Sequence, residues 1–166
     1  MKKTIYLILF VLLASMLAVG CTGSSREKTA SSGVDQDTSW KESVQKNSAL
    51  LQTDFENVGT ALSDTNNPDY TTLSTTGQNM VDDSQKALTE NKQSNVSSKY
   101  QDAQKEWVLA LEDSNSAGKY LIMVANDGKS GNMNIENVNN VTSFSNSATA
   151  HLKRTATLTQ IADGTA

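Results

Sequence analysis

Few side chains in this 166-residue chain are suited to catalysis or metal binding. His151 is the only histidine, so a Ser-His-Asp or Cys-His site has one candidate base, and the sequence contains no G-x-S-x-G motif. A zinc site usually needs four nitrogen or sulfur ligands, whereas the chain offers one histidine and one cysteine, Cys21. We interpret His151, beside Leu152 and near Lys153 and Arg154, as a solvated residue or as one that complements the helix dipole. The sequence therefore predicts no enzyme, no metal and no other cofactor.

Two pairs of adjacent carboxylates have the residue type needed for acid–base catalysis, Asp82-Asp83 and Glu112-Asp113. Adjacent residues on a helix point about 100° apart, so the two members of a pair do not face one substrate. Solvated helix faces explain both pairs better.

Two short segments match the acceptor pattern for N-glycosylation, at Asn95 and at Asn140. The pattern is frequent by chance in a chain rich in Asn, Ser and Thr. It matters only if the source organism glycosylates exported proteins.

The amino-terminal segment has the pattern of a signal peptide. Lys2 and Lys3 precede an uncharged apolar run from Ile5 to Leu17, which small residues follow. The run is shorter than the ~20 residues that a helix needs to cross a bilayer core. We therefore expect residues 1–20 to be a leader rather than a permanent transmembrane helix.

The end of this leader, Leu17-Ala18-Val19-Gly20-Cys21, resembles the lipobox of prokaryotic lipoproteins. The resemblance implies that the thiol of Cys21 receives a diacylglyceryl group and that cleavage occurs just before it. Two acyl chains hold a protein firmly on a membrane, whereas one chain binds only marginally. An ordinary secretory leader with an incidental cysteine is the alternative.

Composition limits the partners of the mature chain. Without Lys2 and Lys3, 12 basic residues face 18 acidic ones, a formal charge of −6. This balance argues against nucleic acid as a partner and disfavours close contact with anionic lipid. Residues 21–38, rich in Ser, Gly and Thr, are predicted to be a flexible tether that holds a domain of residues 39–163 off the membrane.

Four segments of the domain have apolar or small residues at alternating spacings of three and four, which predicts four helices. They run from Trp40 to Leu62, from Tyr70 to Asn91, from Val96 to Val124 and from Asn132 to Ile161. Asn67 is the predicted N-cap of the second helix, with Pro68 at its first position, and Gly128 is predicted to end the third.

Short connections between helices of this length predict an all-α, antiparallel up-down-up-down four-helix bundle. In that topology Trp40, Tyr100 and Trp107 lie in the half nearest the tether, and Tyr70 and Tyr120 lie in the far half.

Small residues recur on the predicted helix seams, at Gly77, Ser114 and Gly118. They either let the helices approach closely or leave a cavity between them. If a cavity forms, Tyr100, Trp107, Ser114 and Gly77 are the predicted lining of a ligand pocket.

These observations lead to two hypotheses of function. The first is a non-enzymatic lipoprotein, anchored outside the cytoplasm to membrane lipid through Cys21, whose bundle binds an unknown envelope protein or organises the surface. The second is a small-ligand-binding or sensory bundle that uses the pocket between helices.

Overall fold

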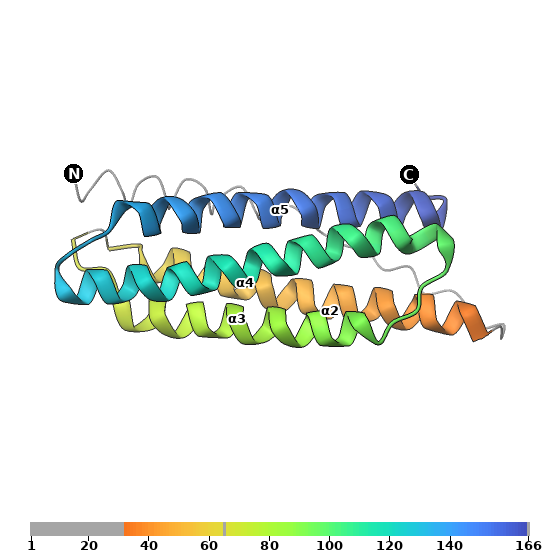
Figure 1. Ribbon diagram of the computed structural model, residues 1–166, viewed down its shortest axis with the longest axis horizontal. Coiled ribbons are helices and arrows are strands. Elements are labelled where there is room, and N and C mark those ends of the chain that lie inside the picture. Colours follow the sequence, from red (N-terminus) through yellow and green to blue (C-terminus); the bar gives the residue numbers. More distant parts are fainter. Residues whose placement is uncertain (1–31, 65, 166) are drawn as a thin grey trace.

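The computed structural model describes residues 32–64 and 66–165, and four long helices dominate it (Figure 1). They are α2 (Ser32–Ala61), α3 (Tyr70–Lys92), α4 (Gln101–Ser130) and α5 (Ile135–Asp163), with the 3-10 helix η2 (Ser98–Tyr100) leading into α4. No strand occurs within residues 32–64 and 66–165. The predicted all-α four-helix bundle is confirmed.

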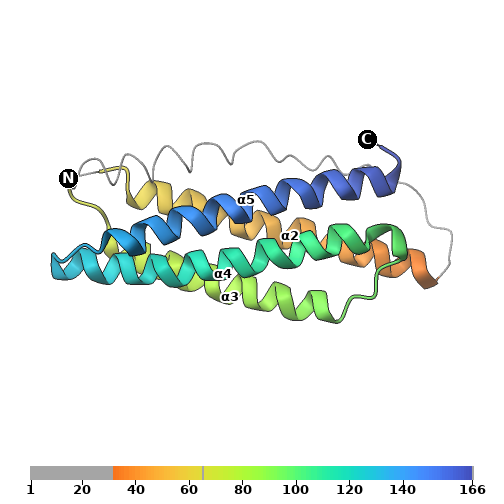
Figure 2. The same ribbon diagram turned by 45° about the horizontal axis from the view of Figure 1, so that its top comes forward.

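The helices run alternately up and down (Figures 1 and 2). At one end, which we call the proximal end, Trp40 of α2 bonds Asn91 of α3 and lies beside Tyr100. At the opposite, distal end, Tyr70 of α3 lies against Gly128 of α4. Trp40 and Tyr70 are therefore at opposite ends, as the sequence predicts for this topology.

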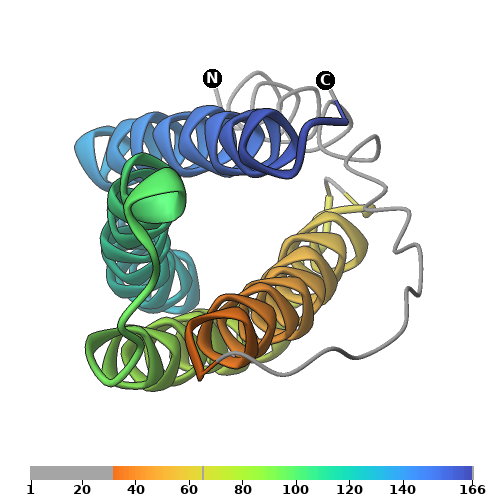
Figure 3. The same cartoon turned by 90° about the vertical axis from the view of Figure 1, so that its right-hand side faces the viewer.

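Seen along the bundle, α4 lies between α3 and α5, and α2 packs on α3 (Figure 3). Seven-residue spacing organises the buried positions, with Tyr100, Trp107, Ser114 and Leu121 on one line. The principal large apolar side chains of the core are Trp40, Leu51, Phe55, Leu62, Leu73, Met80, Trp107, Leu111, Leu121 and Val138.

Two glycines set the distance between α3 and α4. A Cβ atom added to Gly77 would lie 2.8 Å from the carbonyl oxygen of Gly118, and one added to Gly118 would lie 2.6 Å from that of Gly77. Both distances are too short for a carbon atom, so the two backbones touch where side chains normally separate helices. Close packing, rather than a cavity, is the role of this pair.

Several helix boundaries differ from the sequence prediction. Asp69, not Asn67, caps α3, because its carboxylate accepts hydrogen bonds from the backbone N–H groups of Thr71 and Thr72. Pro68 consequently precedes the cap instead of starting the helix. The third helix begins with η2 at Ser98, later than its predicted start near Val96.

Gly128 does not end the third helix. α4 continues to Ser130 and is capped by Gly131, whose φ of 74° is the left-handed conformation that glycine adopts easily. Gly128 has a packing role instead, because a Cβ there would lie 2.1 Å from the ring of Tyr70.

The first helix begins at Ser32, earlier than the predicted domain start at Ser39. Residues 32–38, which the sequence places in the tether, therefore belong to α2, and Asp37 among them is buried. Any tether after Cys21 is limited to residues 22–31.

The glycine contact predicts a large difference between two similar substitutions. Gly118→Ala should lower the free energy of unfolding by about 1–3 kcal/mol, because its new methyl group overlaps the Gly77 carbonyl. Gly59→Ala in α2 meets nothing within 4 Å and should raise stability by up to about 1 kcal/mol through helix propensity. Urea unfolding of both variants measures the difference, and equal effects would refute the close contact.

Candidate functional site

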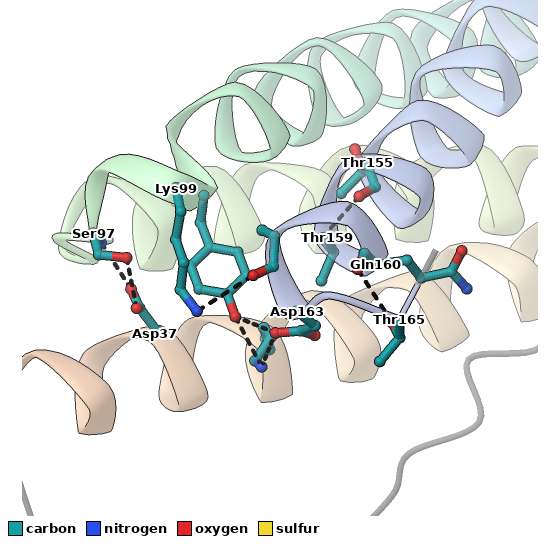
Figure 4. A network of polar contacts seen from close by, with 11 residues as sticks. Asp37, Ser97, Lys99, Thr155, Thr159, Gln160, Asp163 and Thr165 are labelled. Carbon is teal, nitrogen blue, oxygen red and sulfur yellow. Dashed lines mark hydrogen bonds and ion pairs between the residues drawn. The ribbon is translucent and has the colours of Figure 1, made fainter.

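The proximal end holds a set of polar contacts that joins three parts of the chain (Figure 4). The Tyr100 hydroxyl donates a hydrogen bond to the Asp163 carboxylate. Lys41 Nζ lies 2.9 Å from Asp163 Oδ1 and donates to the Tyr100 hydroxyl oxygen at 3.2 Å. α2, η2 and the last turn of α5 are thereby fixed to one another.

These contacts shift the ionisation of both charged partners. Burial by itself would lower the pKa of Lys41, but its hydrogen bonds to Asp163 and Tyr100 outweigh burial and raise it. Burial by itself would raise the pKa of Asp163, but the hydrogen bonds from Tyr100 and Lys41 lower it. Both groups therefore keep their charges over a wide pH range.

Asp37 makes a second connection at the same end. One carboxylate oxygen accepts from the backbone N–H of Ser97 at 2.7 Å, and the other accepts from the Ser97 hydroxyl at 2.7 Å. Ser97 is the residue before η2, so Asp37 satisfies a backbone donor at the start of that turn. We call Asp37, Lys41, Ser97, Tyr100 and Asp163 the proximal clasp.

Aromatic and cationic groups surround the clasp. The ring of Trp40 lies 5.9 Å from that of Tyr100, and its indole N–H donates to Asn91 Oδ1 at 2.9 Å. Lys99 Nζ lies 4.7 Å from the centre of the Tyr100 ring, close enough for a cation–π contact. Sequence reasoning placed Tyr100 near Trp40 but missed Asp37, which lies on the Trp40 stripe three residues earlier.

A second cluster pins α5 to α4 in the middle of the bundle. His151 Nδ1 lies 2.5 Å from Glu106 Oε2, and its Nε2 lies 3.8 Å from Asp113 Oδ2. Arg154 lies 3.8 Å from Glu106. The prediction of a solvated His151 is wrong, since 18% of its side chain is exposed and carboxylates of α4 flank it. Asp113 is likewise part of a contact rather than of a purely solvated face.

A third polar feature lies between α2 and α3. Asp54 is buried with 4% exposure, and its Oδ2 atom has no hydrogen-bond partner in the described part of the chain. Burial raises the pKa of Asp54 to about 7, and the charge of Asp83 on α3 adds to the rise. This seam carries a carboxyl group that is costly to ionise.

Two turns earlier in α2, Asn47 is hydrogen-bonded through its amide nitrogen, while its Oδ1 atom has no partner in the described part of the chain. Its amide donates to Glu90 Oε2 at 2.9 Å and to the Ser43 carbonyl at 2.9 Å. The hydrogen bonds from Asn47 and then Ser43 lower the pKa of Glu90. Helix α2 is therefore held to α3 partly by polar contacts, which the sequence pattern did not indicate.

The four residues predicted to line a ligand pocket are all buried and packed against protein. Tyr100 belongs to the proximal clasp, and Trp107 is 1% exposed in the core. The Ser114 hydroxyl donates to the Ala110 carbonyl within α4, and Gly77 touches Gly118. The surroundings of these residues favour close packing over a shared pocket.

A shallow groove of about 260 Å³ lies elsewhere, on the surface of the proximal half. It is formed where α3 ends and α4 begins, and Asn91, Lys92, Ser94, Gln104, Lys105 and Val108 line it. The surface of the groove is about equally polar and apolar, and two of the residues that line it are lysines.

Of the remaining predicted sites, the two possible glycosylation sites lie in the described part of the chain, and the lipidation site does not. Asn95 is exposed in the connection between α3 and η2. Asn140 is half-buried within α5, and the hydroxyl of Thr142 in the same acceptor pattern is buried. The leader and the lipidation site Cys21 lie outside the described residues.

No known family's sequence model matches the chain, nor does any curated protein or solved structure. In residues 32–64 and 66–165, no helix combines the length and apolar character needed to span a bilayer. The same residues contain no group of three or more His, Cys, Asp or Glu side chains placed to hold a metal ion.

The clasp predicts a loss of stability that depends on pH. Asp163 has a lowered pKa in the folded state, so its contribution is present above its ordinary value near 3.8 and is lost in stronger acid. Asp163→Asn should lower the free energy of unfolding by about 1–2 kcal/mol at pH 7. The difference from wild type should shrink below pH 4, and a difference independent of pH would contradict the ionic role.

The buried carboxyl of Asp54 predicts the opposite pH dependence. Its folded-state pKa of about 7 exceeds its ordinary value of 3.8, so the folded state binds the extra proton and loses stability as the pH rises between these values. Asp54→Asn should therefore raise the free energy of unfolding by about 1–3 kcal/mol at pH 8 and change it little at pH 4.

Asp82→Asn is the matched control for Asp54→Asn, because Asp82 is an exposed neighbour of Asp83. Its effect should stay within about 0.5 kcal/mol at both pH values. Chemical unfolding at pH 4, 6 and 8 measures all three proteins. Equal responses of the two variants would show that burial does not govern Asp54.

Proposed function

We propose that this chain is a lipoprotein, anchored outside the cytoplasm to membrane lipid, whose helical bundle is a non-enzymatic module for binding an envelope protein or organising the surface. The observation that carries the proposal is the Leu17–Cys21 motif, a lipobox-like sequence after a cationic and apolar leader. A diacylated cysteine at this position would hold the chain firmly on a bilayer.

The position of the bundle relative to Cys21 supports this proposal. Residues 22–31 separate the cysteine from α2. A chain of about ten residues spans at most ~35 Å, so the bundle would stay close to its anchor. The proximal clasp would fix the end of the bundle at which the chain enters.

The packed interior supports an interaction module over a ligand-binding bundle. The side chains predicted to line a pocket contact other protein groups, and Gly77 and Gly118 close the α3–α4 seam. The one histidine is engaged by Glu106. A packed helical rod offers its outer faces for contact, and a protein partner is the class of ligand that such faces suit.

The anchor predicts a defined result for Cys21→Ala. Wild type expressed in a bacterium with a lipoprotein pathway should incorporate labelled palmitate and fractionate with membranes, and its mature mass should start at Cys21. The Cys21→Ala variant should lose the label and escape cleavage at this site, while the helical circular dichroism of its bundle is unchanged. Unlabelled wild type, or cleavage at another bond, would refute the anchor.

A further inference from the structure

The two halves of helix α2 are held to the rest of the bundle in different ways. Side-chain hydrogen bonds to other segments are confined to its first half in the described part of the chain. These contacts are Asp37 with Ser97, Trp40 with Asn91, Lys41 with Tyr100 and Asp163, and both Ser43 and Asn47 with Glu90.

The second half, residues 48–61, lacks such contacts. Within residues 32–64 and 66–165, no side chain of this segment forms a hydrogen bond or an ion pair with another helix, and Gln52, Thr53 and Thr60 bond only within α2. Its apolar side chains, including Leu51 and Phe55, are buried. Apolar packing alone therefore holds the second half in place.

Helix α2 lies at the edge of the bundle (Figure 3). Among the described helices, α2 makes extensive contact with α3 alone, whereas α4 packs on both α3 and α5. The contact of Gly77 with Gly118 joins α3 to α4, and the stacked rings of Tyr120 and Phe144 join α4 to α5. Movement of the second half of α2 would leave these contacts intact.

A buried carboxyl group lies in the middle of this segment. Asp54 has an oxygen without a partner, and the charge of Asp83 on α3 opposes its ionisation. The nearby cations of the seam, Lys46 and Lys86, act on Glu90 instead. An ionised Asp54 thus has no counter-charge on α3, and exposure to water would relieve the cost of its burial.

We infer that residues 48–61 of α2 form a strap that opens away from α3 while the proximal clasp stays closed, and that loss of the proton on Asp54 favours the open form. The hinge lies after Asn47, the last residue of α2 whose side chain bonds α3. Opening would expose Leu51 and Phe55, so this carboxyl controls how much apolar surface the bundle presents. The inference does not depend on the proposed lipid anchor.

The direction of the pH effect follows from where the proton binds. Burial raises the pKa of Asp54 to about 7 in the closed form, whereas its ordinary value of 3.8 applies once the strap is open. The closed form therefore binds the proton more tightly. Opening becomes easier as the pH rises between these two values and changes little above them.

Hydrogen–deuterium exchange of the full chain in a mild detergent, at pH 5, 6, 7 and 8, tests the strap. Protection factors, which correct for the intrinsic pH dependence of exchange, report the opening of each helix. Amides of residues 52–61 should be about tenfold or more less protected than those of residues 41–47 and of the buried part of α4. Equal protection of the two halves of α2, or of the strap and α4, would overturn the inference.

The proton on Asp54 is tested in the same measurement. Protection of residues 52–61 should fall about tenfold or more between pH 5 and pH 7. Asp54→Asn should remove this dependence, and Asp83→Asn should weaken it because the opposing charge is lost. Asp82→Asn, at an exposed neighbour, is the matched control and should behave as wild type. A wild-type pH response in Asp54→Asn or in Asp83→Asn would sink the proposed role of this proton.

Discussion

The close approach of α3 and α4 at Gly77 and Gly118 is the contact on which the arrangement of the bundle depends. The two backbones touch there, α4 also packs on α5, and its side chains Trp107, Leu111 and Leu121 are buried. The distance between two helices is set by the side chains at their contact, and glycine gives the smallest distance. Gly128 does the same at the distal end by making room for the Tyr70 ring.

Polar groups inside the bundle divide into two kinds with opposite consequences. Both carboxylate oxygens of Asp37 accept hydrogen bonds from Ser97, and such a satisfied group fixes how the segments meet. Asp54 has a buried oxygen without a partner and lies near another carboxylate, so it weakens the α2–α3 seam once it ionises. Helix α2 is consequently fixed most firmly at the proximal end, through the clasp.

The two ends of the bundle differ in chemistry as well as in packing. Asp37 and Glu106 near the proximal end are engaged by Ser97 and His151, and both lysines and carboxylates are exposed to solvent at this end. The distal end presents carboxylates, including the helix cap Asp69.

The periodic spacing of apolar residues determined the number of helices, their order and, with the short connections, their alternating direction. That information is local, because a 3.6-residue period and short connections suffice to define amphipathic helices that must pack together. It placed Trp40 with Tyr100 and opposite Tyr70, and its reading of Gly77, Ser114 and Gly118 as seam residues kept both close packing and a cavity open. Helix ends were less accurate, since Asn67 and Asp69, or Gly128 and Gly131, are equally acceptable caps until tertiary contacts choose between them.

Only the tertiary structure decided which polar residues meet. His151 pairs with Glu106 across 45 positions of sequence, Asp37 bonds Ser97 across 60, and Asp163 joins Tyr100 across 63. Each residue by itself resembles an ordinary charge on a solvated helix. The sequence by itself determined that four amphipathic helices follow a lipobox-like leader; the rotation and offset of those helices, which no local pattern encodes, decided which charges turn inward and which face outward.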